Sequence, residues 1–322
     1  MTYRWARLEI ANETFFHYRR NNPSLIPVPD FSPQSAWRPQ WTLFDSTNAD
    51  ALNRFDRAFM QLEFGDFKTT FGKQVVPMGV GQIFNAVSQI QRYPLIFIDP
   101  EFPKTEDAAT FIWSGPFQVE ARYLPKSPGQ QTDNFHFRMK KTISGIDIAL
   151  TGGRSDNKTF FGGESAFNVG QGLLRVELVS YFSNQKHYGQ GLLGFDYVFS
   201  PAWSSKWEVF YNSFGEVTQN PLTGLFHRSA PFQGTWYAGN VTTWEIHPLL
   251  KANLVSIVNL KDPSALFHFF LNYSISNSWD LLAGQFLNVG SGTSEFGGQF
   301  RLTPVMSLGQ PDISYAALRW YF

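Results

Sequence analysis

The sequence predicts an all-β fold: a transmembrane up-and-down antiparallel β-barrel of about 16 strands, with short periplasmic turns and long extracellular loops. Three observations predict it. Aromatic residues make up 17% of the chain and charged residues only 16%. No window of about 20 residues is free of polar side chains, which argues against membrane-spanning helices and leaves a closed barrel as the way to cross lipid. The chain also ends in an alternating segment, residues 312–322.

That last segment has two chemically different faces. Ala316 and Leu318 alternate with Arg319 and Tyr321, so one face suits lipid and the other a wet interior. A terminal aromatic residue such as Phe322 is typical of the signal read by the bacterial barrel-insertion machinery. That machinery is therefore an expected partner, as are outer-membrane lipid and lipopolysaccharide. An ordinary edge strand of a soluble sheet is the alternative for this segment alone.

Similar segments of about ten alternating residues recur along the chain, each long enough to cross the bilayer as a tilted strand. Sixteen can be placed, at residues 3–16, 54–64, 67–76, 107–113, 116–124, 134–141, 145–152, 158–166, 172–182, 189–199, 203–213, 234–246, 249–259, 265–274, 278–288 and 312–322.

The connections between these segments alternate in length. Every second one is short and has turn chemistry, as at Gly65-Asp66 and Asn277-Ser278. The intervening connections are longer, and the longest are residues 17–53, 77–106, 214–233 and 289–311. An even strand count with both termini periplasmic satisfies the geometry of a closed barrel. Residues 1–322 are therefore expected to form a single outer-membrane β-barrel domain.

Composition and motifs narrow the function. The chain has 26 basic and 26 acidic residues and no basic tract, so nucleic acid is not an expected partner. The absence of cysteine excludes disulfides, thiolate metal sites and cysteine nucleophiles. The six histidines form no catalytic constellation, and no cluster has metal-ligand spacing. We predict no enzyme, cofactor or metal. Since the chain begins without a signal peptide, we expect that one has been removed.

The strand faces predict a polar lumen of mixed charge. Residues 116–124 set Glu120 and Arg122 opposite apolar side chains, and residues 134–141 do the same with Arg138. A cation facing lipid at the bilayer midplane costs about 2–4 kcal/mol, so these charges are expected to point inwards. The predicted pore-lining residues are Arg57, Glu63, Glu120, Arg122, His136, Arg138, Lys140, Arg175 and Glu177.

Two uses of these charges remain open. In the first, Arg122 and Arg138 stabilise anions in an aqueous channel while Glu63 and Glu120 hold the arginines extended. In the second, the charges pair with one another and fill the lumen. The width of about sixteen strands favours a channel, since side chains alone fill a barrel of only about eight.

The connection at residues 77–106 is too apolar for a solvated loop of its length. We expect it to fold into the barrel, where it either narrows a pore or plugs it. The alternative is an exposed aromatic patch that binds a partner.

Around this loop, residues 71–85 (FGKQVVPMGVGQIFN) resemble a motif of a widespread, largely uncharacterised family of Gram-negative porin-like outer-membrane β-barrel proteins. Members tend to have a Gly-Arg-Gln run, a Trp-Gly pair and an Asn-Pro pair. Here Lys73, Met78 and Ala86 take the places of the arginine, tryptophan and proline. The resemblance covers most of the chain after Arg54 and extends to residues 174–181, 193–197, 207–212, 244–250 and 318–322. It implies a porin-like barrel.

These features predict a porin-like channel of the bacterial outer membrane for passive diffusion of small hydrophilic solutes or ions, as a monomer or a homotrimer. The alternative is a loop-plugged structural barrel that acts as a scaffold or partner in a larger cell-envelope assembly. Single-channel conductance separates the two, because only the first conducts.

Overall fold

The structure is a computed structural model of the chain. It describes residues 3–18, 40–45, 49–87, 105–126, 132–155, 157–183, 187–215, 232, 234–291, 294–297, 300–303, 306–308 and 313–320. Every regular element in these residues is a β-strand. The described residues contain no helix long and apolar enough to cross a membrane.

Sixteen strands of the described chain correspond to the sixteen predicted segments, with ends displaced by a few residues. They are β1 (Tyr3–Tyr18), β3 (Ala49–Phe64), β4 (Phe67–Val75), β5 (Thr105–Ser114), β6 (Gln118–Leu124), β7 (Asn134–Ile143), β8 (Ile146–Ser155), β9 (Lys158–Val169), β10 (Gly172–Phe182), β11 (His187–Ser200), β12 (Trp203–Asn212), β13 (Trp236–His247), β14 (Leu250–Asn259), β15 (Ser264–Ser276), β16 (Trp279–Val289) and β19 (Ile313–Trp320). Three short strands were not predicted: β2 (Gln40–Asp45), β17 (Phe300–Thr303) and β18 (Met306–Leu308).

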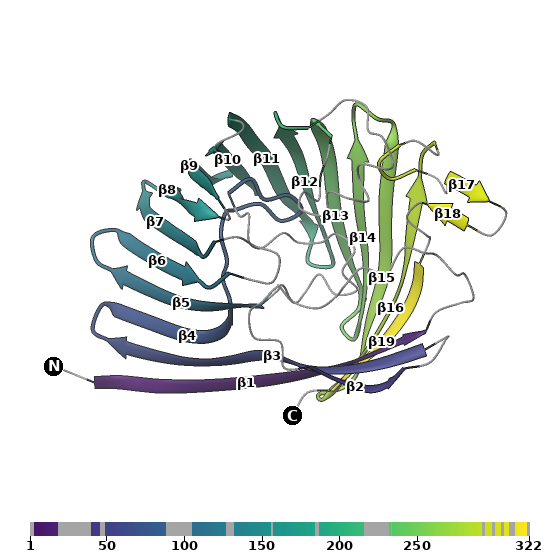
Figure 1. The fold of residues 1–322 in the computed structure, drawn as a ribbon, viewed down its shortest axis with the longest axis horizontal. Helices are drawn as coiled ribbons and strands as arrows, with labels where there is room; N and C mark the ends of the chain where they lie inside the picture. Colours follow the sequence, from purple (N-terminus) through teal and green to yellow (C-terminus); the bar gives the residue numbers. More distant parts are fainter. Residues whose placement is uncertain are drawn as a thin grey trace.

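The sixteen strands form one antiparallel ladder in chain order, from β1 and β3 through to β16 and β19. Figure 1 shows this ladder curving into a wall around an interior. The end strands β1 and β19 lie beside each other, so the seam of the barrel is between them. The short strand β2 pairs with the first part of β3, and β17 pairs with β18. The predicted fold class, a transmembrane up-and-down β-barrel, is confirmed.

Tight turns join the strands at one end of the barrel, which we call the short-turn end. The turns from β3 to β4, β7 to β8 and β15 to β16 each contain two residues. Ser144 and Gly145, which join β7 to β8, both have positive φ (50° and 79°), as a two-residue hairpin of the primed type requires. At the opposite end the connections are generally longer. The exception is the connection from β8 to β9, which contains only two residues, 156–157.

The outer face of the wall is apolar. On β7, Phe135 and Phe137 are exposed while His136 between them is buried, because successive strand residues point to opposite faces. Aromatic pairs gather at the short-turn end, including Phe199 with Trp203 at 4.3 Å between ring centroids. An apolar outer band with aromatic residues near its edge is the pattern of a barrel wall in lipid.

The inner face is only partly the polar lumen of mixed charge that the strand faces predict. The inner faces of β6 to β9, here called the charged wall, carry Glu120, Arg122, Arg138, Lys140, Asp147 and Glu164. The inner faces of β12 to β16, here called the apolar wall, instead carry Phe210, Tyr237, Val255, Ile257, Leu266, Phe270, Leu282 and Phe286, all buried in one cluster. The expectation of a polar interior therefore applies to only part of the barrel. The reason is that loop residues cover the apolar wall, so its side chains form a core.

Candidate functional site

The chain after β4 turns into the barrel, and we call residues 76–87 the inner loop (Figure 1). Its apolar side chains drive this placement: Met78, Ile83 and Phe84 are all buried. Phe84 packs against the apolar wall, with its ring stacked on that of Phe210 at 5.2 Å. Burying each such side chain is worth about 1.5–3 kcal/mol relative to exposing it.

Two carboxylates on the wall bind the backbone of the inner loop. Glu177 of β10 and Glu208 of β12 are both buried. Buried N–H groups outside a sheet need other acceptors, and leaving one unpaired costs about 1–3 kcal/mol. These two anchoring carboxylates supply the acceptors. The donors are the N–H groups of Val80, Gly81 (2.6 Å), Ala86 (2.8 Å) and Val87 (3.3 Å) to Glu177, and of Gln82 (2.7 Å), Ile83 (2.9 Å) and Phe84 (2.8 Å) to Glu208.

Cationic and hydroxyl groups of the wall bind the loop's carbonyl groups. Arg122 donates from Nη1 to the carbonyl oxygen of Pro77 at 2.6 Å. Arg175 donates to the carbonyl oxygen of Val80 at 2.7 Å, and the Tyr181 hydroxyl donates to that of Ala86. Both the donors and the acceptors of the loop backbone are therefore held by side chains from the wall.

Glycine is required at one position of this arrangement. Gly79 has a φ of +78°, and a Cβ atom there would lie 2.5 Å from Oε1 of Glu177. A side chain at this position would carry both backbone strain and a clash with an anchoring carboxylate. The Met78-Gly79 pair stands where the resembled family has Trp-Gly. The positive φ and the nearby Glu177 explain why this position is a glycine.

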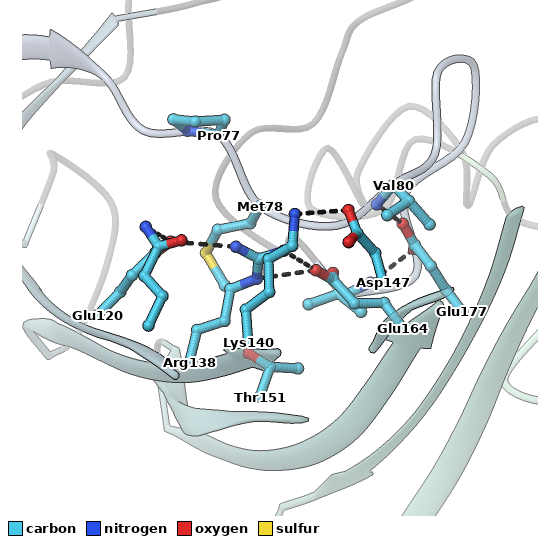
Figure 2. A network of polar contacts seen from close by, with 12 residues as sticks. Pro77, Met78, Val80, Glu120, Arg138, Lys140, Asp147, Thr151, Glu164 and Glu177 are labelled. Carbon is cyan, nitrogen blue, oxygen red and sulfur yellow. Dashed lines mark hydrogen bonds and ion pairs between the residues drawn. The ribbon is translucent and has the colours of Figure 1, made fainter. Parts of the chain in front are cut away.

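The charged wall is a chain of ion pairs beneath the inner loop (Figure 2). Glu120 contacts both Arg122 and Arg138, the latter at 3.1 Å. Arg138 also donates from Nε to Glu164 at 2.8 Å. Because each arginine has a carboxylate and several donors, the pairs are charge-assisted hydrogen bonds in a mostly buried setting.

Three further ion pairs extend this chain of charges. Lys140 lies 2.7 Å from Asp147, near the short-turn end. Arg175 donates from Nε to Asp196 at 3.1 Å and also pairs with the anchoring carboxylate Glu208. Glu208 therefore joins the charges of the wall directly to the backbone of the loop.

The structure places the predicted pore-lining residues in two groups. Seven lie on β6, β7 and β10 around the inner loop: Glu120, Arg122, His136, Arg138, Lys140, Arg175 and Glu177. Of these, His136 is buried with its Nδ1 against the sulfur of Met78. Arg57 and Glu63 lie apart from these contacts on β3, where Arg57 pairs with Glu9 at 3.4 Å and Glu63 accepts from Gln61 at 2.8 Å.

The expected roles of the charges change accordingly. Arg122 and Arg138 were expected to stabilise anions, but their described contacts are with Glu120, Glu164 and the loop. Glu120 does contact both arginines, whereas Glu63 accepts from its strand neighbour Gln61 instead. The difference arises because Glu63 lies one residue before the end of β3, beside the turn, and pairs in register with Lys68.

Sequence reasoning assigned no role to Glu208 or Glu164. Both occupy inward-facing positions on strands whose side chains alternate between the two faces. This period of two in the sequence was a usable signal that their side chains point into the barrel. Nothing in the sequence marked Glu208 as an acceptor for backbone N–H groups from a loop more than a hundred positions earlier. Among the described residues, no three His, Asp or Glu side chains gather as a metal site would require. The absence of enzymatic activity stays a prediction.

The sequence matches no protein-family model and no curated protein. Solved structures from Pseudomonas aeruginosa share its fold. OccD3 (OpdP) has a TM-score of 0.53 at 9% identity, covering 98% of this chain and 90% of that one. OccK5 (OpdH) has a TM-score of 0.53 at 11% identity, covering 98% of both chains. OccK10 (OpdN) has a TM-score of 0.52 at 11% identity, covering 99% of this chain and 98% of that one.

These neighbours are outer-membrane β-barrel porins of a Gram-negative bacterium. The chain has the fold of a porin. At such low identity the likeness concerns the fold alone. Residues 71–85 and later segments resemble porin-like barrels of the outer membrane in sequence, and the fold of these neighbours agrees with that resemblance.

Proposed function

We propose that the chain is an outer-membrane channel for passive diffusion of small hydrophilic solutes or ions, and that the inner loop narrows it. The porin fold supports the channel role. The observation that carries the proposal is the inner loop bound to one side of the wall by Glu177 and Glu208. A loop held to one side narrows a lumen and leaves the opposite side to water.

The opposite side has the chemistry of a solute path. The inner faces of β1, β3 and the first residues of β4, here called the accessible wall, carry half-buried polar side chains instead of a packed core. They include Glu9, Arg57, Gln61, Glu63 and Lys68. Charges of both signs with access to water suit hydrophilic solutes and give weak ion preference. The predicted pore-lining residues Arg57 and Glu63 therefore keep that role in the proposal.

The channel proposal also gives the orientation of the barrel in the membrane and the partners that it meets there. Short turns of outer-membrane barrels face the periplasm, so the short-turn end and both termini are placed there. Lipid, lipopolysaccharide and the barrel-insertion machinery are the partners that such a barrel meets. The full loop predicted at 77–106 and the single domain at 1–322 remain predictions, since residues 88–104 lie outside the described part of the chain.

Single-channel recording of the purified, folded protein in a planar bilayer tests the proposal. We expect steady conductance, and the reversal potential under a salt gradient gives the sign of the selectivity. Addition of a neutral sugar to a liposome-swelling assay tests passage of uncharged solutes. Folded protein that neither conducts nor admits the sugar would overturn the channel proposal.

One observation favours the structural alternative. The inner loop does not only line the lumen: Phe84 packs with Phe210, Phe232 and Tyr237 into a continuous apolar core. A barrel filled in this way suits a closed scaffold of a cell-envelope assembly. A variant lacking residues 78–86 separates the two, because removal of a plug creates conductance where the intact protein shows none.

A further inference from the structure

The outer face of β7 and β8 contains a groove near the short-turn end. It has a volume of about 230 Å³ and is lined by Phe117, Met139, Lys140, Lys141, Ile143, Ile148 and Leu150. Apart from the two lysines, every residue in this lining is apolar. The groove is on the side of the wall that faces lipid, because its Met139, Ile148 and Leu150 belong to the exposed apolar set.

The groove has a direction set by the strand register. Phe117 belongs to the turn after β5, and Ile143 ends β7, so these two lie at the membrane edge. Met139 pairs with Leu150 farther along the strands, and Lys141 pairs with Ile148 between the two levels. The apolar lining therefore runs from the edge of the barrel towards the middle of the bilayer, as an acyl chain does.

The two neighbouring lysines of β7 differ in their partners. Lys140 points into the lumen and pairs with Asp147 at 2.7 Å. Lys141 is exposed on the opposite face, and no ion pair or hydrogen bond joins it to another described residue. A cation on a lipid-facing surface needs a counter-charge, and at this depth the nearest one in a membrane is a lipid phosphate.

The position of Lys141 allows that contact. It lies two residues from the end of β7, which is about 7 Å along the strand. A lysine side chain can extend over such a distance and place its ammonium group at headgroup level while its methylene groups stay in lipid. The phosphate and the acyl chain of one lipid would then lie at the two ends of the same groove.

We propose that this groove is a binding site for a glycerophospholipid, with the lipid phosphate on Lys141 and one acyl chain along Met139, Ile148 and Leu150. The site is on the outside of the barrel. It requires that the barrel lies in a bilayer and does not require that the lumen conducts.

The test is titration of the purified, folded barrel in detergent with dioleoyl phosphatidylglycerol, with bound lipid counted by native mass spectrometry. Lys141→Gln removes the charge and is expected to weaken lipid binding about tenfold. Lys141→Arg keeps the charge, so its affinity for the lipid is expected to stay within about twofold of the wild type. Leu150→Trp fills the groove and is expected to abolish the tight adduct. Leu193→Trp is the matched control, because Leu193 is also exposed on the outer face but lies on β11, away from the groove.

Three results would overturn the site. Wild-type affinity in Lys141→Gln would show that the cation is not used. Equal weakening by Leu193→Trp and Leu150→Trp would show that lipid binds the whole surface without preference. Equal binding of dioleoylglycerol, which has no phosphate, would show that the headgroup is not recognised. Conductance recorded from the same preparations keeps the channel proposal separate, since either can fail alone.

Discussion

The accessible wall and the apolar wall are built from strands with the same alternation of inward and outward side chains, yet their inward side chains lie in opposite environments. On β3, Arg57 is half-buried with 29% of its side chain exposed. On β14, Ile257 is completely buried. The comparison teaches that the inward-facing positions of a barrel do not share one environment. A loop that covers part of the wall turns that part into a core, whereas the inward side chain of Arg57, on another part of the wall, stays partly exposed.

The first and largest test of this comparison is removal of an anchoring carboxylate. Glu208→Ala leaves three loop N–H groups without their acceptor and Arg175 without one of its two carboxylate partners. Each unpaired buried group costs about 1–3 kcal/mol, so the inner loop is expected to detach. Conductance should rise, and proteases should cleave within residues 76–87.

The matched control is Glu63→Ala on the accessible wall. It removes a carboxylate that accepts from Gln61 and that, among the described residues, has no hydrogen bond or ion pair with the inner loop. We expect the proteolysis pattern of the wild type. Equal sensitivity in the two variants would contradict the assignment of Glu208 as an anchor.

A second test compares the core with the lipid face. Phe84→Ala removes a ring that stacks on Phe210 and contacts Phe232 and Tyr237, which is expected to cost about 3–5 kcal/mol of unfolding free energy. Phe137→Ala on β7 removes a ring of the same size from the exposed outer face and should cost much less. Urea unfolding of both variants in one detergent measures the difference, and similar losses would mean that the inner loop is not packed on the apolar wall.

A third test concerns the backbone of the inner loop. Gly79→Ala places a Cβ at a positive φ and against Glu177. The positive φ alone is expected to cost an alanine about 1–2 kcal/mol of folding free energy. Gly163→Ala on β9 is the control, because its Cβ would meet no atom closer than 3.5 Å. Hydrogen exchange of the loop amides should accelerate in the first variant only; unchanged exchange in Gly79→Ala would count against the described loop conformation.

The smallest effect is expected for charge on the accessible wall. Arg57→Gln removes one positive charge beside the proposed solute path, so the reversal potential should move towards cation preference while stability changes little. Lys141→Gln removes the same charge from the outer face of the barrel and should leave selectivity as it was. Identical reversal potentials in the two variants would remove Arg57 from the pore lining.

Much of the fold was predictable because strand structure is local. A period of two set the sixteen strands and their apolar and polar faces, and Gly or Asn at the turns set the boundaries. The candidate site was predictable only in part. The inward direction of Glu120, Arg122 and Arg138 follows from the same period, and the apolar content of residues 77–106 predicted that the loop turns inwards.

What the sequence by itself determined is therefore the direction in which each strand residue points. Which inward residues meet water, which pair and which form a core was decided only by the tertiary structure. Glu177 and Glu208 show the physical reason: they bind backbone N–H groups, which every residue except proline has, so no side-chain pattern marks their partners. Only the path of the inner loop through the barrel brings those groups to the two carboxylates.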